Sequence, residues 1–410
     1  MTPPSQFEIL REELDGFVVP NSPFITNVQP LASYNWIEAP AHKPTIAVPG
    51  CPALWSAPQG LKRLKKDSGL IYIAQNAARL PESPLEPLFR ALYTTHPLFD
   101  IRSTDVVSDR NNIRKLLSFV DRSISTKGLE PFTINIEVIK DTTIFCRDES
   151  KTQEYIGPHE FRGFGHEFEK AYTINQVQGS TGHHRVISYR FGDLSFIIRH
   201  ETDAYVASKT RDASTDSKQD GLSSMLEALS LSLDRNTTCI TPAGSKLIVK
   251  EEGCDVSLAA TLEIKTRVLH KPMDFREVAP QLWVSQTPKL VRAYHQNGSF
   301  QNPAVEDVST EIKNWEKSKQ NALGKLAALI RKIMILVKAC GGRATLKYDA
   351  GGDRLQICEA KTKNMLPEDL YSKWDLSTTA QVERVRTSNH DPTSQQNTSP
   401  VSPHLRARVT

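Results

Sequence analysis

Two short acidic motifs in this chain have the residue types and the spacing for metal-dependent chemistry. In the first, IIRHETDAYV (residues 197–206), Glu201 and Asp203 interrupt a run that otherwise reads as a buried strand. A carboxylate taken out of water costs several kcal/mol unless it is paired, hydrogen-bonded or bound to a metal. The pattern therefore predicts a partner for these carboxylates elsewhere in the chain.

The second motif, LEIKTR (residues 262–267), is the predicted partner. Glu263 and Lys265 are two residues apart, as are Glu201 and Asp203, so on a strand each pair projects from one face. Two such strands side by side would bring the four side chains together. The three carboxylates would then repel one another unless a divalent cation lay between them, and oxygen ligands suit Mg²⁺ or Mn²⁺.

Lys265 supplies a group that a hydrolytic reaction would need. Its ammonium could hold an attacking water or neutralise the charge that develops on a phosphoryl oxygen, as metal-assisted phosphodiester hydrolysis requires. An acidic pair followed by Glu-x-Lys is also common by chance, and exposed strand edges carry such residues routinely. The two motifs by themselves leave both interpretations open.

The elements that must position these residues show both strand and helix patterns. Apolar and β-branched runs bounded by turn residues predict three hairpins, which turn at Lys140–Asp141, Gly192–Asp193 and Gly351–Gly352. Apolar residues at helical spacing predict helices over RNNIRKLLSFVDRS (residues 110–123), residues 161–172 and residues 312–337. This mixture predicts an α+β fold of mixed β-sheets flanked by helices.

The ends of the chain differ in composition from its middle. Residues 1–30 are rich in proline and predict an irregular arm. Residues 376–410 are rich in Ser, Thr, Pro, Gln and Asn, and they predict a disordered tail because they offer too little apolar surface to offset the entropy of ordering. From their composition, residues 31–375 are predicted to form a single catalytic-type domain with a polar insertion at about 207–247.

Composition excludes several classes of protein. The 410 residues are 39% hydrophobic and carry a formal charge of +4, so a large core is expected and nucleic acid is allowed as a partner without being implied. We find neither a membrane span nor a signal peptide. Six cysteines without a Cys-x-x-Cys pair disfavour a zinc site and fit the reduced thiols of an intracellular protein.

The stretch LKRLKKDSG (residues 61–69) reads either as a nuclear address, which favours the nucleus over the cytoplasm, or as a basic helix cap.

Taken in order, five segments resemble the DXO/Rai family of RNA 5′-end decapping nucleases, which has the PD-(D/E)XK nuclease fold. The resemblance runs from about Asp105 to Glu359 and is carried by SDRNNIRKLL, FRGFGHEFEKAYT, GDLSFIIRHETDAYV, LEIKTR and APQLWVSQTPKLVRAYHQNG. It implies one or two divalent cations, Mg²⁺ or Mn²⁺, held by Glu169, Glu201, Asp203 and Glu263. It also implies that Lys265 and Gln281 place the nucleophilic water and that Arg110 holds the 5′ phosphate of the RNA.

Three of the implied residues also have a purely structural interpretation. Glu169 could face solvent, Gln281 could be a helix surface residue, and Arg110 could pair with Asp109 or Asp105. The sequence also departs from the family pattern, most of all in a longer segment between the acidic pair and the Glu-x-Lys strand. This departure leaves open which cap or end would be cleaved.

Three functional hypotheses remain. The first is a metal-dependent RNA 5′-end hydrolase that removes incomplete or non-canonical caps, releases pyrophosphate or digests RNA in the 5′→3′ direction. The second is a catalytically weak relative that stabilises a partner 5′→3′ exoribonuclease, which an exposed apolar patch outside the metal site would favour. The third is a PD-(D/E)XK nuclease acting on DNA, which a cleft wide enough for a duplex would favour.

Overall fold

The structure is a computed structural model that describes residues 6–17, 23–124, 128–207, 238–360 and 363–375. Most of the insertion expected at about 207–247, and the tail expected at 376–410, lie outside the described residues. The described residues up to Trp374 belong to one compact unit. Where an irregular arm was expected, the N-terminal segment contains a strand that joins the edge of the main sheet.

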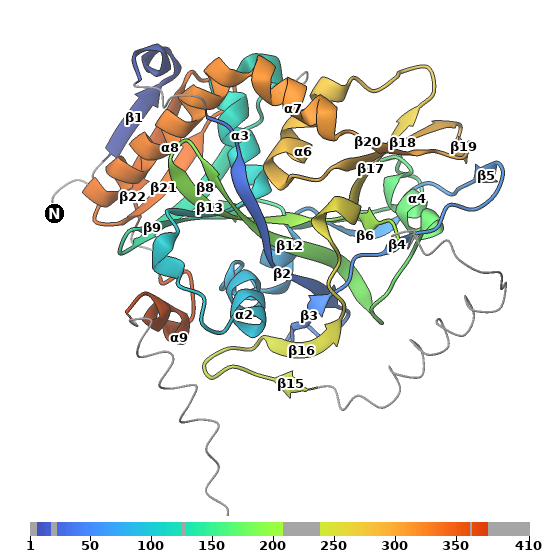
Figure 1. Ribbon diagram of the computed structural model, residues 1–410, viewed down its shortest axis with the longest axis horizontal. Coiled ribbons are helices and arrows are strands. Elements are labelled where there is room, and N and C mark those ends of the chain that lie inside the picture. The colour runs from blue at the N-terminus through green and yellow to red at the C-terminus, as the bar shows by residue number, and fades with distance from the viewer. Residues whose placement is uncertain (1–5, 18–22, 125–127, 208–237, 361–362, 376–410) are drawn as a thin grey trace, which may run out of the picture. The chain divides into compact units, whose positions relative to one another are not determined.

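A large mixed sheet forms the centre of this unit (Figure 1). In spatial order, its strands in the described residues are β1 (Gln6–Leu10), β22 (Arg354–Glu359), β21 (Arg343–Tyr348), β8 (Phe132–Ile139), β9 (Thr142–Asp148), β7 (Val106–Asp109), β13 (Leu194–Glu201), β12 (Ser180–Phe191), β2 (Thr26–Ile37), β3 (Thr45–Gly50), β16 (Ile248–Gly253) and β15 (Cys239–Ile240). The pairs β9·β7, β7·β13 and β3·β16 are parallel. β13 is buried along almost its whole length, as expected of a strand that is covered on both faces.

A second sheet contains the Glu-x-Lys motif. Its strands in the described residues are β11 (Thr173–Ile174), β4 (Leu54–Trp55), β14 (Ala204–Tyr205), β17 (Thr261–Val268), β18 (Lys289–Gln296), β19 (Ser299–Phe300) and β5 (Lys62–Arg63), with β20 (Val305–Asp307) paired to β18. A separate ribbon joins β6 (Gly69–Tyr72) to β10 (Gln153–Ile156). The basic stretch at 61–69 therefore contributes strand residues, and the interpretation as a helix cap is wrong.

The helices are short except for one. They are α1 (Gln75–Arg79), α2 (Glu86–Thr95), α3 (Arg110–Val120), α4 (Gly165–Tyr172), α6 (Ala279–Ser285), α7 (Ser309–Ser318), α8 (Gln320–Ala339) and α9 (Glu368–Tyr371). Single 3₁₀ turns lie at Arg11–Gly16, Ile101–Ser103, Arg122–Ile124, Leu258–Ala260, Phe275–Glu277 and Ser372–Trp374. Within the described ranges, no helix is long and apolar enough to cross a membrane.

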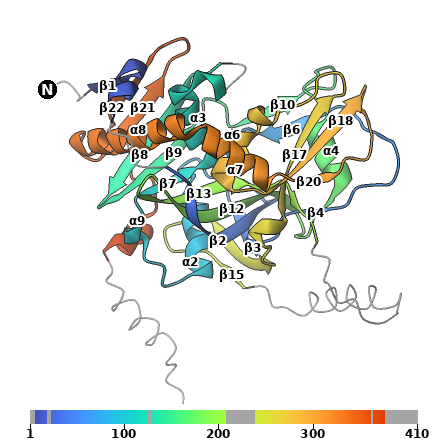
Figure 2. The same cartoon turned by 45° about the horizontal axis from the view of Figure 1, so that its top comes forward.

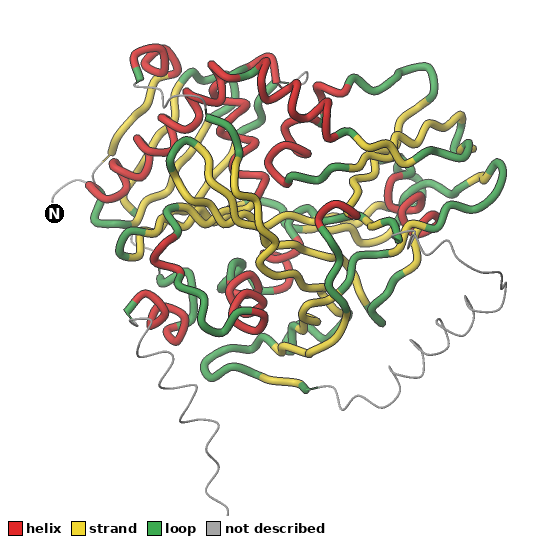
Figure 3. The backbone as a smooth tube through the Cα atoms, viewed as in Figure 1, coloured by secondary structure: helices red, strands yellow, loops and turns green. Residues whose placement is uncertain are grey.

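Helices cover both faces of the large sheet, as the views in Figures 1 and 2 agree. α3, α6, α7 and α8 lie on one face and bury a core that includes Trp283 and Leu329. α2 and α9 lie on the other face over a core that includes Phe89 and Trp374. The tube in Figure 3 shows the helices in red on either side of the yellow strands. α4 packs against the second sheet through a separate, largely aromatic core.

The predicted α+β class, with mixed sheets flanked by helices, is confirmed, and the three predicted hairpins form as β8–β9, β12–β13 and β21–β22. Two predicted helices differ from the structure. The long helix is broken at Lys319, which leaves the helical conformation (φ −106°, ψ 14°) while its ammonium bonds Asp121 at 2.8 Å. The helix expected over residues 161–172 begins only at Gly165, because Gly163 has a φ of 137°, and Phe161 is 58% exposed.

The chain passes from the large sheet to the second sheet just after the first acidic motif. β13 ends at Glu201, and Ala204 of β14 pairs in antiparallel register with Leu262 of β17. The backbone N–H of Thr202 still donates to the carbonyl of His183 on β12, at 2.9 Å. Asp203 therefore lies where the two sheets meet, and the sheet junction brings both acidic motifs to one place.

Candidate active site

The side chains expected at the site come from five different elements. Glu201 ends β13, and Asp203 lies between β13 and β14. Glu263 and Lys265 lie on β17, while Glu169, Gln281 and Arg110 lie on α4, α6 and α3. The prediction that Glu201 and Asp203 project from one continuous strand is wrong in detail, because the strand ends between them. The sheet junction still brings Asp203 beside β17.

Glu263 is the centre of the site. Its side chain is 3% exposed, and one carboxylate oxygen accepts hydrogen bonds from Lys265 Nζ, at 2.5 Å, and from Gln281 Nε2. The other oxygen accepts from Arg110 Nη1 at 3.2 Å. Burial alone would raise the pKa of Glu263, but the charges of Lys265 and Arg110 outweigh it and lower the pKa to about 2. Glu263 is therefore ionised and fully partnered by nitrogen donors.

Asp203 is held against the same strand. Its Oδ2 accepts a hydrogen bond of 2.7 Å from the backbone N–H of Ile264, next to Glu263. Burial and the nearby negative charge of Glu263 raise the pKa of Asp203 to about 8, although Lys265 and the Ile264 N–H oppose the shift. In the metal-free protein, Asp203 therefore holds its proton at neutral pH.

Glu169 and Glu201 complete the group of carboxylates. Burial, Asp203 and Glu201 together raise the pKa of Glu169 well above its usual value. Glu201 is exposed to solvent by surface area, yet desolvation by the surrounding protein still raises its pKa, and Glu263 adds to this effect while Arg110 opposes it. Three of the four carboxylates thus resist ionisation, chiefly through desolvation and further through their mutual repulsion.

α4 is oriented toward this site by a residue that the sequence did not single out. Asp67, which is 4% exposed, accepts the backbone N–H of Glu167 at 3.0 Å, and His166 lies 3.5 Å from its other oxygen. A carboxylate is favourable in the first turn of a helix because it satisfies free N–H groups there. Asp67 therefore fixes the start of the short helix that carries Glu169.

The donor set fits a hard divalent cation in its chemistry. It consists of carboxylate oxygens, which Mg²⁺ and Mn²⁺ prefer, and their pKa values are raised first by desolvation and then by neighbouring carboxylates, an effect that such a cation would oppose. Among the residues that the structure describes, no three His, Cys, Asp or Glu side chains already converge closely enough to hold a metal ion. Metal binding would therefore require Glu263 to exchange part of its contacts with Lys265 and Gln281.

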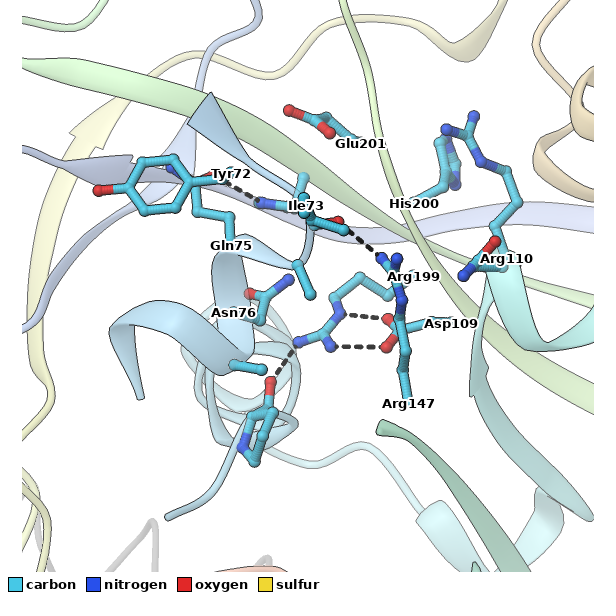
Figure 4. Close-up of a pocket in the computed structure, with 15 residues that line it drawn as sticks. Tyr72, Ile73, Gln75, Asn76, Asp109, Arg110, Arg147, Arg199, His200 and Glu201 are labelled. Carbon is cyan, nitrogen blue, oxygen red and sulfur yellow. Dashed lines mark hydrogen bonds and ion pairs between the residues drawn. The ribbon is translucent and has the colours of Figure 1, made fainter. Parts of the chain in front are cut away.

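A polar pocket of about 110 Å³ adjoins the carboxylates on one side (Figure 4). Arg110 and Glu201 both line it, so it is continuous with the site. One wall comes from Gln75 and Asn76 of α1 and from Tyr72 and Ile73 before it. The remaining lining includes Asn111, Arg147 and His200.

The pocket carries more positive than negative charge. The carboxylate of Asp109, one of its acidic groups, is bound by Arg199 at 2.7 and 3.0 Å. Arg147 faces the pocket (Figure 4), where it donates to the carbonyl of Ile73 at 3.0 Å, and its Nε also binds Glu149 at 2.6 Å. His200 is 3% exposed, and neither of its ring nitrogens has a hydrogen-bond partner among the residues that the structure describes. With Arg110 beside them, these groups suit an anionic ligand.

The purely structural interpretations of Arg110, Gln281 and Glu169 do not agree with the contacts that these residues make. Arg110 contacts Glu263, whereas Asp109 binds Arg199 and Asp105 binds Ser195. Gln281 is 8% exposed and contacts Glu263, and Glu169 is half-buried and influenced by Asp203. The pocket residues of α1 and β9 were missed, because Gln75, Asn76 and Arg147 belong to no motif.

Comparison with known proteins places the chain in a family. A family model described as "Domain of unknown function (DUF8563)" matches residues 24–374. The chain belongs to this family. A search of curated protein sequences finds no match for this DUF8563 member.

Solved structures share the fold of this DUF8563 member. Rai1 from S. pombe has a TM-score of 0.53 at 10% identity, and the match covers 87% of this chain and all of that one. Rai1 from Scheffersomyces stipitis, in complex with (3′-NADP)⁺ and calcium ion, has a TM-score of 0.55 at 12% identity, over 91% and 99% of the two chains. Rai1 from Candida albicans, in complex with pU5-Mn²⁺, has a TM-score of 0.53 at 12% identity, over 90% and 99%. The resemblance expected from the sequence is thus confirmed as a likeness of fold, at the low identity of a divergent relative.

Proposed function

We propose that this protein is a metal-dependent hydrolase of RNA 5′ ends. It would remove incomplete or non-canonical caps, act as a 5′ pyrophosphohydrolase, digest RNA from the 5′ end, or combine these reactions. The observation that carries the proposal is the gathering of four carboxylates and Lys265 at the sheet junction, where the pKa values of Glu169, Glu201 and Asp203 are raised. Perturbed pKa values of this kind cluster at functional sites, and a cation would stabilise the ionised form of each carboxylate.

Each side chain has a distinct role in this proposal. Glu169, Glu201, Asp203 and Glu263 would hold one or two cations, Mg²⁺ or Mn²⁺, which supply a Lewis acid for phosphoryl chemistry. Lys265 and Gln281, which now contact Glu263, would hold the nucleophilic water through their N–H groups. Arg110 would bind the 5′-terminal phosphate through the rest of its guanidinium.

Two further observations support an RNA end as the substrate. The pocket beside Glu201 is small, at about 110 Å³, and its wall carries Arg110 and Arg147, which suits a single anionic group rather than a duplex. Proteins of the same fold have been solved with pU5-Mn²⁺ and with (3′-NADP)⁺ and calcium ion. These ligands favour a divalent cation and a nucleotide substrate here too. A nuclear location remains a prediction from the basic stretch at 61–69.

A direct assay tests the proposal. Purified protein would be incubated with RNA bearing a 5′ triphosphate, an unmethylated cap or an NAD cap, with EDTA, Mg²⁺ or Mn²⁺. We expect metal-dependent release of a 5′ product, which Asp203→Asn abolishes and Asp141→Asn leaves intact, because Asp141 lies in the exposed β8–β9 turn. The absence of product from every RNA, together with no metal binding by calorimetry, would refute the proposal.

A second role is favoured by one surface feature. Leu70 of β6 and Tyr155 of β10 are directly paired, and they are 52% and 70% exposed. An apolar pair on an exposed ribbon outside the pocket suits a protein partner, and a 5′→3′ exoribonuclease is the partner that the sequence resemblance implies. Co-sedimentation of the purified protein with a purified exoribonuclease would test this role. Tyr155→Ser should weaken the complex, and unchanged binding would count against this surface.

A further inference from the structure

Two cysteines that are far apart in the sequence meet at the edge of the large sheet. Cys51 follows the last residue of β3, and Cys254 follows the last residue of β16. Their sulfur atoms lie 3.1 Å apart. This is closer than non-bonded sulfur contact normally allows and about 1 Å longer than a disulfide bond of about 2.05 Å.

The backbone holds the two cysteines in this position. β3 and β16 are parallel, with Gly50 opposite Gly253, so the cysteines are the next pair in the ladder. The backbone N–H of Cys254 also donates to the carbonyl of Gly50 at 2.9 Å. A Cβ atom on Gly253 would lie 2.2 Å from that carbonyl oxygen, so glycine is needed for the strands to approach so closely.

The two thiols have unequal surroundings. Cys51 is buried, 1% exposed, and packs against Tyr205 and Val256, whereas Cys254 is exposed. The contact between the two sulfur atoms lowers the pKa of Cys254 to about 7, and the same contact, together with burial, raises the pKa of Cys51. The exposed sulfur therefore supplies a reactive thiolate, and the buried one a protected thiol within reach of it.

We propose that Cys51 and Cys254 form a redox-active dithiol that closes reversibly to a disulfide. The proposal is independent of the RNA-directed function. With a hydroperoxide as oxidant, the Cys254 thiolate attacks one peroxide oxygen, the O–O bond breaks, and a sulfenic acid and hydroxide form. The Cys51 sulfur then attacks the Cys254 sulfur, the S–O bond breaks, and water leaves. In sum, two thiols and one hydrogen peroxide give one disulfide and two waters.

The position of the pair connects it to the sheet junction. Cys51 contacts Tyr205, two residues after Asp203. The segment that begins at Cys254 leads into β17, and the carbonyl of Val256 accepts a hydrogen bond of 2.8 Å from Arg185 Nη2. Arg185 pairs across β12 and β13 with His200, which lines the pocket. A disulfide would thus fix the start of the segment that carries Glu263.

Peptide mapping tests the proposal directly. The reduced full-length protein would be treated with one equivalent of hydrogen peroxide, its remaining thiols blocked in denaturant, and its tryptic peptides analysed without reduction. Cys51 and Cys254 fall in peptides 12–62 and 251–265, and each peptide contains a single cysteine, so the link is unambiguous. We expect this linked pair, a fall from six to four free thiols, and recovery of six with dithiothreitol.

Variants separate this pair from the other cysteines. Cys254→Ser should abolish the link without disturbing the core, because Cys254 is exposed, and Cys239→Ser, at another exposed cysteine, should leave it intact. The proposal would be overturned by links that involve Cys239 instead, by over-oxidation of Cys254 while Cys51 stays free, or by six free thiols after treatment. None of these results depends on whether RNA is hydrolysed.

Discussion

Replacement of Asp203 by Asn should stabilise the metal-free protein, and by more as the pH rises. The pKa of Asp203 is raised from 3.8 to about 8 in the folded state, so between these values the folded protein keeps a proton that the unfolded chain has lost. Folding stability then falls by up to about 1.4 kcal/mol for each pH unit. Asn is neutral at every pH and has no such loss, so the advantage of Asp203→Asn should grow by about 2.5 kcal/mol between pH 5.5 and 7.5.

The low pKa of Glu263 adds nothing to this slope, because above about pH 5 the residue is ionised in both folded and unfolded states. Buried histidines such as His200, whose pKa is lowered by burial, change stability in the opposite direction, but they do so equally in both proteins and cancel in the difference.

Thermal and urea unfolding in EDTA at pH 5.5, 6.5 and 7.5 would measure the effect. For a unit the size of Met1–Trp374, it corresponds to about 2 °C in Tm for each pH unit. Asp141→Asn, in an exposed turn, should behave as the wild type. If the difference in unfolding free energy between Asp203→Asn and the wild type stays constant or shrinks as the pH rises, the raised pKa of Asp203 is refuted.

Three further predictions concern metal and charge. Mn²⁺ at 100 times its Kd should raise the unfolding free energy of the wild type by about 2.7 kcal/mol, and that of Asp203→Asn by much less. Equal increases in the two proteins would exclude Asp203 as a ligand. Glu263→Gln should lose RNA hydrolysis and about 3 kcal/mol of stability, because Arg110 and Lys265 lose their common partner; a stable, active variant would contradict this. Arg199→Lys should cost about 2 kcal/mol in urea unfolding because it breaks the paired bonds to Asp109, whereas Arg102→Lys, in an exposed pair, should change little.

The sequence predicted the local elements better than the arrangement that joins them. Hairpins were predictable because alternation and turn residues such as Gly192–Asp193 are local signals. The break at Lys319 was not, because it depends on Asp121, a residue distant in the sequence. The sequence predicted from charge alone that Asp203 approaches Glu263. It did not predict that the strand before Asp203 ends at the sheet junction, with Glu201 as its last residue, and that a short strand, β14, continues the chain in the second sheet.

The pocket could not have been predicted from the sequence. Its lining residues Gln75, Asn76 and Arg147 come from segments without a motif, and only tertiary packing places them near Arg110. Asp67, which fixes the start of α4, was equally invisible, because its partner is a backbone N–H 100 residues further along the chain.

The direct pairing of β14 with β17 has a consequence for how this chain can vary. Ala204 lies opposite Leu262, although residues 205–261 intervene in the sequence. Backbone hydrogen bonds between β14 and β17 therefore hold the two acidic motifs side by side, whatever the length of the chain between them. Since closing a loop twice as long costs only about 0.6 kcal/mol more, the number of residues between the two motifs has little direct effect on this pairing. The carboxylates can thus keep their arrangement while the chain between the two motifs differs in length from one relative to another.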